Sequence, residues 1–310
     1  MLPYTFYDYP RGDIDTLTKF AIFGIPWDAN STHMQGCARA APLKLREITS
    51  HLARMTEKGH NIEEFAAADF GDVNIYPSLP DKSRSNIIEF VKEFLPWKSA
   101  SLLPIMIGGD HYCTYPVVKA LSEIYAEKSQ EKIGVIIFDA HLDYYDKWLD
   151  VETDFHCTVT KRITDLPNID PEHVAVIGIR DADIPEYELA RTDGLYWVNA
   201  YELYPYDQLQ NQIEKLITYY RAKNITKIYL SIDIDALDGA VAPGTGYTLP
   251  GGLSYRDLWL FLQKIIQNFT LIGMDLVEVA PDMDLPSKLT QITAVKLITE
   301  TMAFITEKED

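Results

Sequence analysis

Basic residues are scarce in this chain. Its 310 residues include 28 Lys and Arg against 46 Asp and Glu, which gives a formal net charge of -18. Nucleic acid and anionic membrane surfaces both require a basic face on the protein that binds them, so we expect neither as a partner. A small cationic substrate suits this negative field. An acidic surface that keeps the protein in solution is the alternative explanation for the charge.

Cysteine and long apolar runs are scarce as well. Cys37, Cys113 and Cys157 are too few and too scattered for a disulfide framework, and no pair has the Cys-x-x-Cys spacing of zinc or redox sites. No run approaches the ~20 apolar residues of a membrane span. The stretch Met1–Asp13 lacks the apolar core of a signal peptide. We therefore expect a soluble protein in the reducing cytoplasm.

Linkers, internal repeats and low-complexity segments are also absent, and 47% of the residues are hydrophobic, enough for a large core. Short apolar runs alternate with amphipathic stretches, which predicts an α/β fold with a mainly parallel sheet, in a single domain of residues 1–310. The expected strands are Phe20–Ile25, Phe65–Phe70, Pro104–Ile107, Ile133–Phe138, Val174–Ile179, Leu195–Val198, Ile228–Ile232 and Leu271–Val277. The expected helices are Tyr115–Lys128, Asp207–Lys223, a helix capped by Ser254 that runs through Phe269, and Leu289–Ile305.

Possible metal ligands alternate with apolar residues in two of the strand-end segments. Asp139, His141 and Asp143 follow one strand, and Asp233 and Asp235 end another. Side chains two apart on a strand point to the same side, and parallel sheets bind ligands at the carboxyl ends of their strands. We therefore expect these donors at alternate strand positions, facing one site.

A glycine turn supplies a sixth donor. Gly108-Gly109-Asp110-His111 follows the apolar run Pro104–Ile107, so His111 should reach the same sheet edge. Four carboxylates and two imidazoles without a thiolate favour a hard or borderline divalent ion such as Mn²⁺, although Ni²⁺, Fe²⁺ and Co²⁺ also fit. Two ions ~3.5 to 4 Å apart would use all four carboxylates and trap a nucleophilic hydroxide. Ordinary strand-end residues without a metal are the alternative.

At these residues the chain resembles the ureohydrolase family, the arginases and agmatinases. The resemblance runs from about Gly24 to the C-terminus and is carried by Gly108–His111, Asp139–Asp143, Ser231–Asp235 and the loop Ala242–Gly246. It implies a three-layer α/β/α fold with an eight-stranded parallel sheet. It also implies a binuclear manganese centre that hydrolyses guanidino groups to urea and an amine, in a homo-oligomer that is a trimer or a hexamer.

The resemblance further implies a role for each site residue. Two bridging ligands and two ligands to each Mn²⁺ are expected, namely Asp139 and Asp233 as bridges, His111 and Asp143 on one ion, and His141 and Asp235 on the other. Glu278 matches the family glutamate that holds the planar guanidinium, and His156 matches the histidine that protonates the departing amine. Asp143 would also hydrogen-bond the hydroxide. An ordinary loop acid and a surface histidine are the alternatives for Glu278 and His156.

The loop after Asp143 bears on the substrate. Residues 144–154 lack the Asn and Ser with which arginases hold the amino-acid end of arginine, and their acidic form is similar to archaeal-type agmatinases. We therefore expect agmatine to be cleaved to putrescine and urea, a step of polyamine biosynthesis. Asp183 resembles an arginase aspartate that contacts the substrate amino group, although it could instead cap a helix. Lys147 could serve a carboxylate.

Three departures from the family pattern keep other substrates open. Cys157 stands in place of a usual Gly, Gly239 in place of a Pro, and Tyr247-Thr248-Leu249 in place of Thr-Pro-Glu. Arginine, guanidinobutyrate and aminopropylagmatine therefore remain alternatives. A zinc-dependent deacetylase and an inactive family member are the rival classes, although every ligand position of the family is filled.

Overall fold

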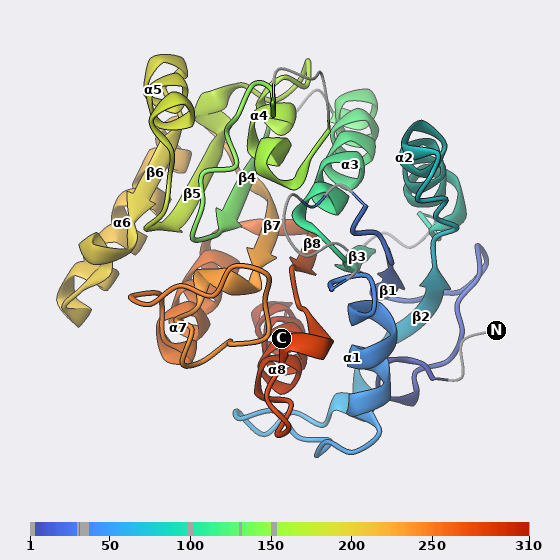
Figure 1. Ribbon diagram of the computed structural model, residues 1–310. Helices are drawn as coiled ribbons and strands as arrows, with labels where there is room; N and C mark the ends of the chain where they lie inside the picture. The colour runs from blue at the N-terminus through green and yellow to red at the C-terminus, as the bar shows by residue number, and fades with distance from the viewer. Residues whose placement is uncertain are drawn as a thin grey trace.

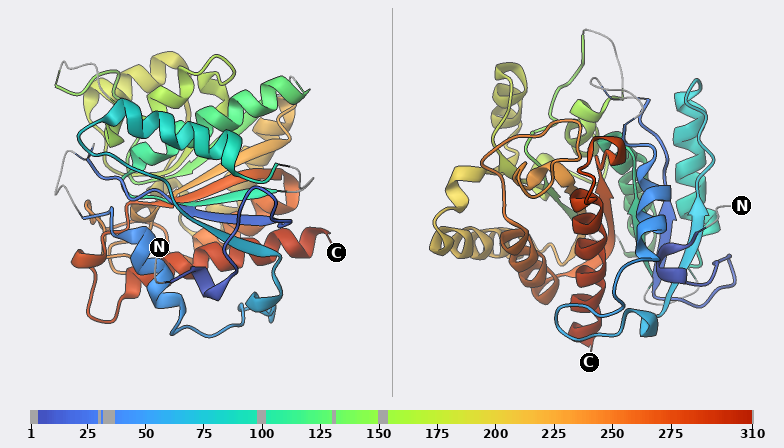
Figure 2. Two further views of the ribbon diagram at one scale, coloured as in Figure 1. Left: turned by 90° about the vertical axis from the view of Figure 1, so that its right-hand side faces the viewer. Right: turned by 60° about the horizontal axis from the view of Figure 1, so that its bottom comes forward.

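The computed structural model describes residues 4–29, 31, 37–97, 102–129, 132–149 and 154–309. An eight-stranded sheet lies between two layers of helices (Figures 1 and 2). The strand order is β2-β1-β3-β8-β7-β4-β5-β6, and every pairing among the described strands is parallel. The predicted α/β class and the three-layer architecture are therefore confirmed. The strands are β1 (Phe20–Gly24), β2 (Ala67–Asp72), β3 (Leu103–Ile107), β4 (Ile133–Phe138), β5 (Val174–Ile179), β6 (Tyr196–Asn199), β7 (Lys227–Asp233) and β8 (Thr270–Val277).

All the predicted helices are present, together with others that the sequence did not reveal. The α-helices are α1 (Ala41–Thr49), α2 (Pro80–Glu89), α3 (Thr114–Ser129), α4 (Val159–Thr164), α5 (Ile184–Asp193), α6 (Tyr206–Ala222), α7 (Tyr255–Asn268) and α8 (Leu289–Glu309). Short 3₁₀ turns near the site are η4 (His111–Cys113), η5 (His156–Thr158) and η8 (Ile234–Ala236). None of the helices in the described ranges is long and apolar enough to cross a membrane.

The sheet separates two hydrophobic cores. Along β4, Ile136 and Phe138 belong to the core beneath α1, α6, α7 and α8, whereas Val135 and Ile137 belong to the core beneath α2, α3, α4 and α5. Successive strand residues point to opposite faces, so a strand covered on both sides must be apolar throughout. This is why β4 reads as an unbroken apolar run, and why its first polar residue marks the edge of the sheet.

The predicted cap of α7 is confirmed. The Ser254 hydroxyl accepts the backbone N–H of Asp257 at 3.2 Å, and the Asp257 carboxylate accepts the backbone N–H of Ser254 at 2.9 Å. This reciprocal pair satisfies two of the free N–H groups at the helix start.

Candidate metal centre and active site

Four neighbouring strands deliver the candidate residues to one edge of the sheet. In the order β3, β8, β7 and β4, they lead to His111, Glu278, Asp233 and Asp139, each at or just past the carboxyl end of its strand. Because these strands are parallel, their carboxyl ends open at the same edge. The glycine turn before His111 is sterically required, since a Cβ at Gly109 would lie only 1.9 Å from a neighbouring backbone carbonyl oxygen.

His111 is at the centre of the first group of candidate ligands. Its side chain is fully buried, and its Nδ1 lies 3.0 Å from Asp139 Oδ2, 3.1 Å from Asp143 Oδ2 and 3.3 Å from Asp233 Oδ2. One imidazole nitrogen therefore faces three carboxylates.

His141 is at the centre of the second group. Its Nδ1 lies 3.2 Å from Asp235 Oδ2 and 3.4 Å from Asp139 Oδ1. The two oxygens of Asp139 thus face different imidazoles, so this carboxylate belongs to both groups. The structure brings all six predicted ligands together, with Asp233 joined to the rest through His111.

The carboxylates do not occupy alternate strand positions as expected. Only Asp233 lies within a strand, whereas Asp139, His141 and Asp143 follow β4 and Asp235 lies in η8. Backbone N–H groups that leave the strand ladder bind the carboxylates instead, at 2.6 Å from His141 N to Asp139 Oδ1 and 2.8 Å from Asp235 N to Asp233 Oδ1. These bonds fix one oxygen of each carboxylate and leave the other facing an imidazole.

Two buried atoms in this cluster test whether it suits a cation. His111 Nδ1 and Asp139 Oδ2 form no hydrogen bond with any described residue, although they lie 3.0 Å apart. Buried polar atoms are nearly always paired, and both atoms are of the kind that binds divalent ions. A cation beside them would satisfy both, so the donor set and its geometry fit a metal centre.

The cluster is strongly electronegative. Burial lowers the pKa of His111, but Asp139, Asp143 and Asp233 raise it by more, so its pKa lies well above the ordinary value. The pKa of His141 is raised in the same way, because Asp235 and Asp139 outweigh the effect of burial. Burial and the charge of Asp139 raise the pKa of Asp143 to about 6. Without metal the site therefore keeps protons to balance its carboxylates, a positive charge that divalent ions would replace.

Glu278 and His156 lie beside this cluster. Glu278 is 9% exposed, and its Oε1 accepts the backbone N–H of His111 at 2.8 Å and lies 3.8 Å from His156 Nδ1. Burial, followed by the charge of Asp110, raises the pKa of Glu278. The structure thus brings the predicted carboxylate and the predicted imidazole next to the candidate ligands.

A cavity of about 130 Å³ adjoins the cluster and includes His141, Asp143, His156 and Asp183 in its lining. Asp183 is exposed and stands at the residue before α5, where its carboxylate accepts the Tyr145 hydroxyl. Its place therefore suits both interpretations made from the sequence, the start of a helix and the rim of a binding site. Residues 150–153 of the loop that favoured agmatine lie outside the described residues.

Sequence reasoning missed how His111 is oriented. Its Nε2 lies 3.2 Å from the Ser231 hydroxyl, which donates to Asp275 at 2.6 Å. Ser231 and Asp275 are register partners on β7 and β8. Such outer hydrogen bonds fix the ring of a metal-binding histidine, here with Nδ1 toward the carboxylates. Ser231 shares a strand face with Asp233, and this spacing was the only signal in the sequence.

The sequence pattern also gave no sign of Glu186, which lines the cavity. Its carboxylate accepts the backbone N–H of Tyr144 at 3.1 Å and that of Asp183 at 2.9 Å. Burial raises the pKa of Glu186 to about 7. Glu186 therefore ties the loop after Asp143 to the start of α5.

A parallel α/β fold with clustered carboxylates and imidazoles at its strand ends is typical of metal-dependent hydrolases. The model of the arginase family matches residues 18–303. The agmatinase of Halalkalibacterium halodurans is 31% identical over 91% of both chains, and that of Pyrococcus horikoshii is 30% identical over 96% of this chain and 97% of its own. The crystal structure of formimidoylglutamase from Bacillus subtilis has a TM-score of 0.85 at 24% identity, over 97% of this chain and 92% of its own, and so shares the fold. The chain belongs to the arginase family, whose hydrolases act on guanidino compounds and typically depend on metal.

Proposed function

We propose that this chain is a single-domain ureohydrolase that cleaves a guanidino compound, preferably agmatine, to urea and an amine. The observation that carries the proposal is the convergence of the six candidate ligands with Glu278 and His156 at one sheet edge. Agmatine is favoured because the two sequence relatives compared above, at 30 and 31% identity, are agmatinases and because the cavity is acidic.

The candidate ligands divide into two groups, which supports a centre for two Mn²⁺ ions. His111 and Asp143 would hold one ion, His141 and Asp235 the other, and Asp139 and Asp233 both, as the family resemblance implies. The position of Asp139 between the two imidazoles supports its bridging role. When bound, the ions would lower the pKa of a water molecule and supply a nucleophile near neutral pH.

Glu278 would hold the guanidinium. A carboxylate and a guanidinium match in charge and planar shape, and the pair can form two parallel hydrogen bonds. The bond from the backbone N–H of His111 already fixes the Glu278 carboxylate. Because burial raises the pKa of Glu278, a bound guanidinium would also favour its charged form. Asp143, at the cavity wall, would accept a hydrogen bond from the nucleophile.

His156 would protonate the amine that leaves. An imidazole can transfer a proton near neutral pH, and His156 both lines the cavity and lies 3.8 Å from Glu278. It is therefore beside the place where Glu278 would hold the guanidinium.

A urea-release assay with added Mn²⁺ tests this proposal. Agmatine, arginine, guanidinobutyrate, guanidinopropionate and free guanidine would each be incubated with the protein. We expect the highest kcat/KM with agmatine and equimolar urea and putrescine. Absence of urea from every compound, together with tight binding of one zinc ion and deacetylase activity, would instead support the deacetylase alternative.

We also propose that the protein is a cytoplasmic homo-oligomer, a trimer or a hexamer, as the family resemblance implies. Sedimentation velocity would measure the assembly, and a monomer at micromolar concentration would contradict it.

A further inference from the structure

Three aromatic rings in the cavity have no part in the reaction proposed above. Tyr145, Trp148 and Tyr247 line it together with His141 and His156. Trp148 packs edge-on against Tyr145, with ring centroids 5.2 Å apart at 86°. Tyr247 lies edge-on to His141 at 5.3 Å and is nearly parallel to His156, at 6.4 Å and 27°. Aromatic rings therefore bound the cavity from two separate loops.

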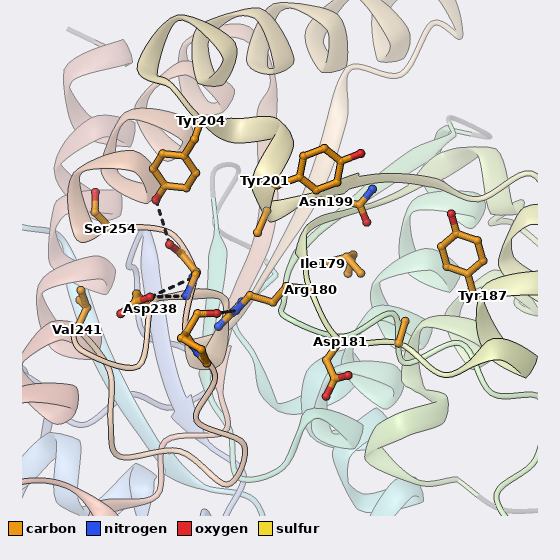
Figure 3. Close-up of a pocket in the computed structure, with 15 residues that line it drawn as sticks. Ile179, Arg180, Asp181, Tyr187, Asn199, Tyr201, Tyr204, Asp238, Val241 and Ser254 are labelled. Carbon is orange, nitrogen blue, oxygen red and sulfur yellow. Dashed lines mark hydrogen bonds between the residues drawn. The ribbon is translucent and has the colours of Figure 1, made fainter.

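The loop that carries Tyr247 is held on both sides. Thr245 forms an antiparallel bridge with Val279, directly after Glu278. Arg180 donates from Nε to the carbonyl of Pro250 at 3.1 Å, and Figure 3 shows its side chain turned toward this loop. Tyr247 is thus a fixed part of the cavity wall.

The remaining polar lining is acidic. Carboxylates line the cavity at four positions, and none of its described lining residues is a Lys or an Arg. They are Asp143, Asp181, Asp183 and Glu186. Asp183 is engaged with the Tyr145 hydroxyl, whereas the Asp181 side chain forms no hydrogen bond or ion pair with any described residue. Lys147, which the sequence offered for a carboxylate, is exposed and is not part of this lining.

We propose that Trp148, Tyr247 and Asp181 form a cage for an organic ammonium group, which receives the far end of the substrate. This inference rests on the ureohydrolase function proposed above and specifies its substrate class. Aromatic faces attract ammonium groups, and a carboxylate adds charge and a hydrogen-bond acceptor. The cage thus selects guanidino compounds that end in an amine, over those that end in a carboxylate or a methyl group.

The cage adjoins a second hollow on the side of Asp181. Asp181 and Ala182 line both this cavity and a larger hollow of about 950 Å³, which Tyr187 and Tyr201 border (Figure 3). In Figure 3 the Asp181 carboxylate is turned away from Arg180, and no ion pair joins the two side chains. A substituent on the far amine can therefore extend into the hollow, and the cage should accept aminopropylagmatine as well as agmatine.

The test compares guanidino compounds that share a four-carbon chain and differ at its far end. kcat/KM would be measured for agmatine, butylguanidine and guanidinobutyrate with the wild type, Asp181→Asn, Trp148→Leu and Tyr247→Leu. Tyr206→Leu is the matched control, since Tyr206 is exposed on α6 and lines neither hollow. Each cage variant should lower kcat/KM for agmatine roughly tenfold more than that for butylguanidine, with the control unchanged on both. Aminopropylagmatine should be cleaved by the wild type within about tenfold of agmatine.

Equal losses on agmatine and butylguanidine, or a wild type that does not distinguish them, would overturn the cage. A second measurement separates this failure from failure of the ureohydrolase function. Binding of putrescine would be followed by tryptophan fluorescence, with butylamine and butyrate for comparison. Weaker putrescine binding in Asp181→Asn and Tyr247→Leu supports the cage even if no urea is released. Binding of butyrate as tight as that of putrescine refutes it.

Discussion

Metal binding should release protons from the candidate centre, because its imidazoles face carboxylates. Burial lowers the pKa of His111 and His141, but carboxylate oxygens 3.0 to 3.4 Å from each Nδ1 raise it by more. Both imidazoles are therefore in the charged form, protonated on both nitrogens, at neutral pH in the metal-free protein. A nitrogen that binds a metal must be unprotonated, so two ions bound at these residues displace two protons.

The size and sign of the effect follow from this count. Since the protonated imidazoles stabilise the metal-free cluster and lose their protons only as the pH rises through their raised pKa, metal affinity must increase with pH. Two protons change the overall binding constant about a hundredfold per pH unit, or ~2.7 kcal/mol. Below pH 6 metal affinity should depend more steeply on pH, because Asp143, whose pKa is raised to about 6, then carries a further proton that the metal must displace.

Isothermal titration calorimetry measures the number of protons directly. Mn²⁺ would be titrated at pH 7 into the metal-free protein in two buffers of different ionisation enthalpy, and the difference in observed heat gives the protons released. We expect at least two for the wild type, because burial also raises the pKa of the ligand Asp233, and about one fewer for His141→Asn. Circular dichroism would show that the variant is folded. Release close to zero in the wild type would refute the reasoning.

Three further substitutions, the last with a matched control, test two site residues and one buried ion pair. His156→Ala should lower kcat about a hundredfold or more with metal content unchanged, and loss of metal along with activity would show that its role is structural. Glu278→Gln, which can still accept the His111 N–H, should lower kcat/KM on the order of a hundredfold without loss of metal, and wild-type kinetics would contradict guanidinium binding. Arg46 donates to both carboxylate oxygens of the buried Asp69, at 2.7 and 2.9 Å. Arg46→Leu leaves this carboxylate without its partner and should lower the free energy of unfolding by about 3 to 5 kcal/mol in urea denaturation. Arg191→Ala breaks the exposed ion pair with Glu188 and should change the free energy of unfolding little. Equal losses of stability in the two Arg variants would contradict this argument.

The sheet could be predicted because most of its strands are buried on both faces and are therefore largely apolar. The bounds differ most for β2, for which the sequence predicts Phe65–Phe70 and which lies at Ala67–Asp72. It extends through polar residues because Arg46 of α1 neutralises Asp69 and Asp72. The same buried Arg46 interrupts the apolar face of α1, so the helical pattern was hidden as well.

The candidate ligands could be predicted because each ends or follows an apolar run. The hydrogen bonds that orient these ligands could not be predicted, because they depend on the order of the strands in the sheet. Asp275 reaches Ser231 only because β8 lies between β3 and β7, and nothing in the sequence indicates that order. Tyr247 was noted as a departure from the family, but its contacts with the two histidines depend on the path of its loop.

The alternation of side chains along a strand also could not predict where the carboxylates of Asp143 and Glu278 point. Asp143 and Glu278 have φ of 50° and 61°, in the left-handed region of backbone conformation that residues other than glycine rarely adopt. Such a conformation costs about 1 to 2 kcal/mol per residue and persists only where the surroundings impose it. Glu278 directly follows β8, and its backbone N–H donates to the Gly109 carbonyl at 2.8 Å. With this bond in place the chain turns at the strand end and its carboxylate meets the His111 N–H. The packed sheet therefore supplies the rigidity that holds a strained backbone where guanidinium binding would need it.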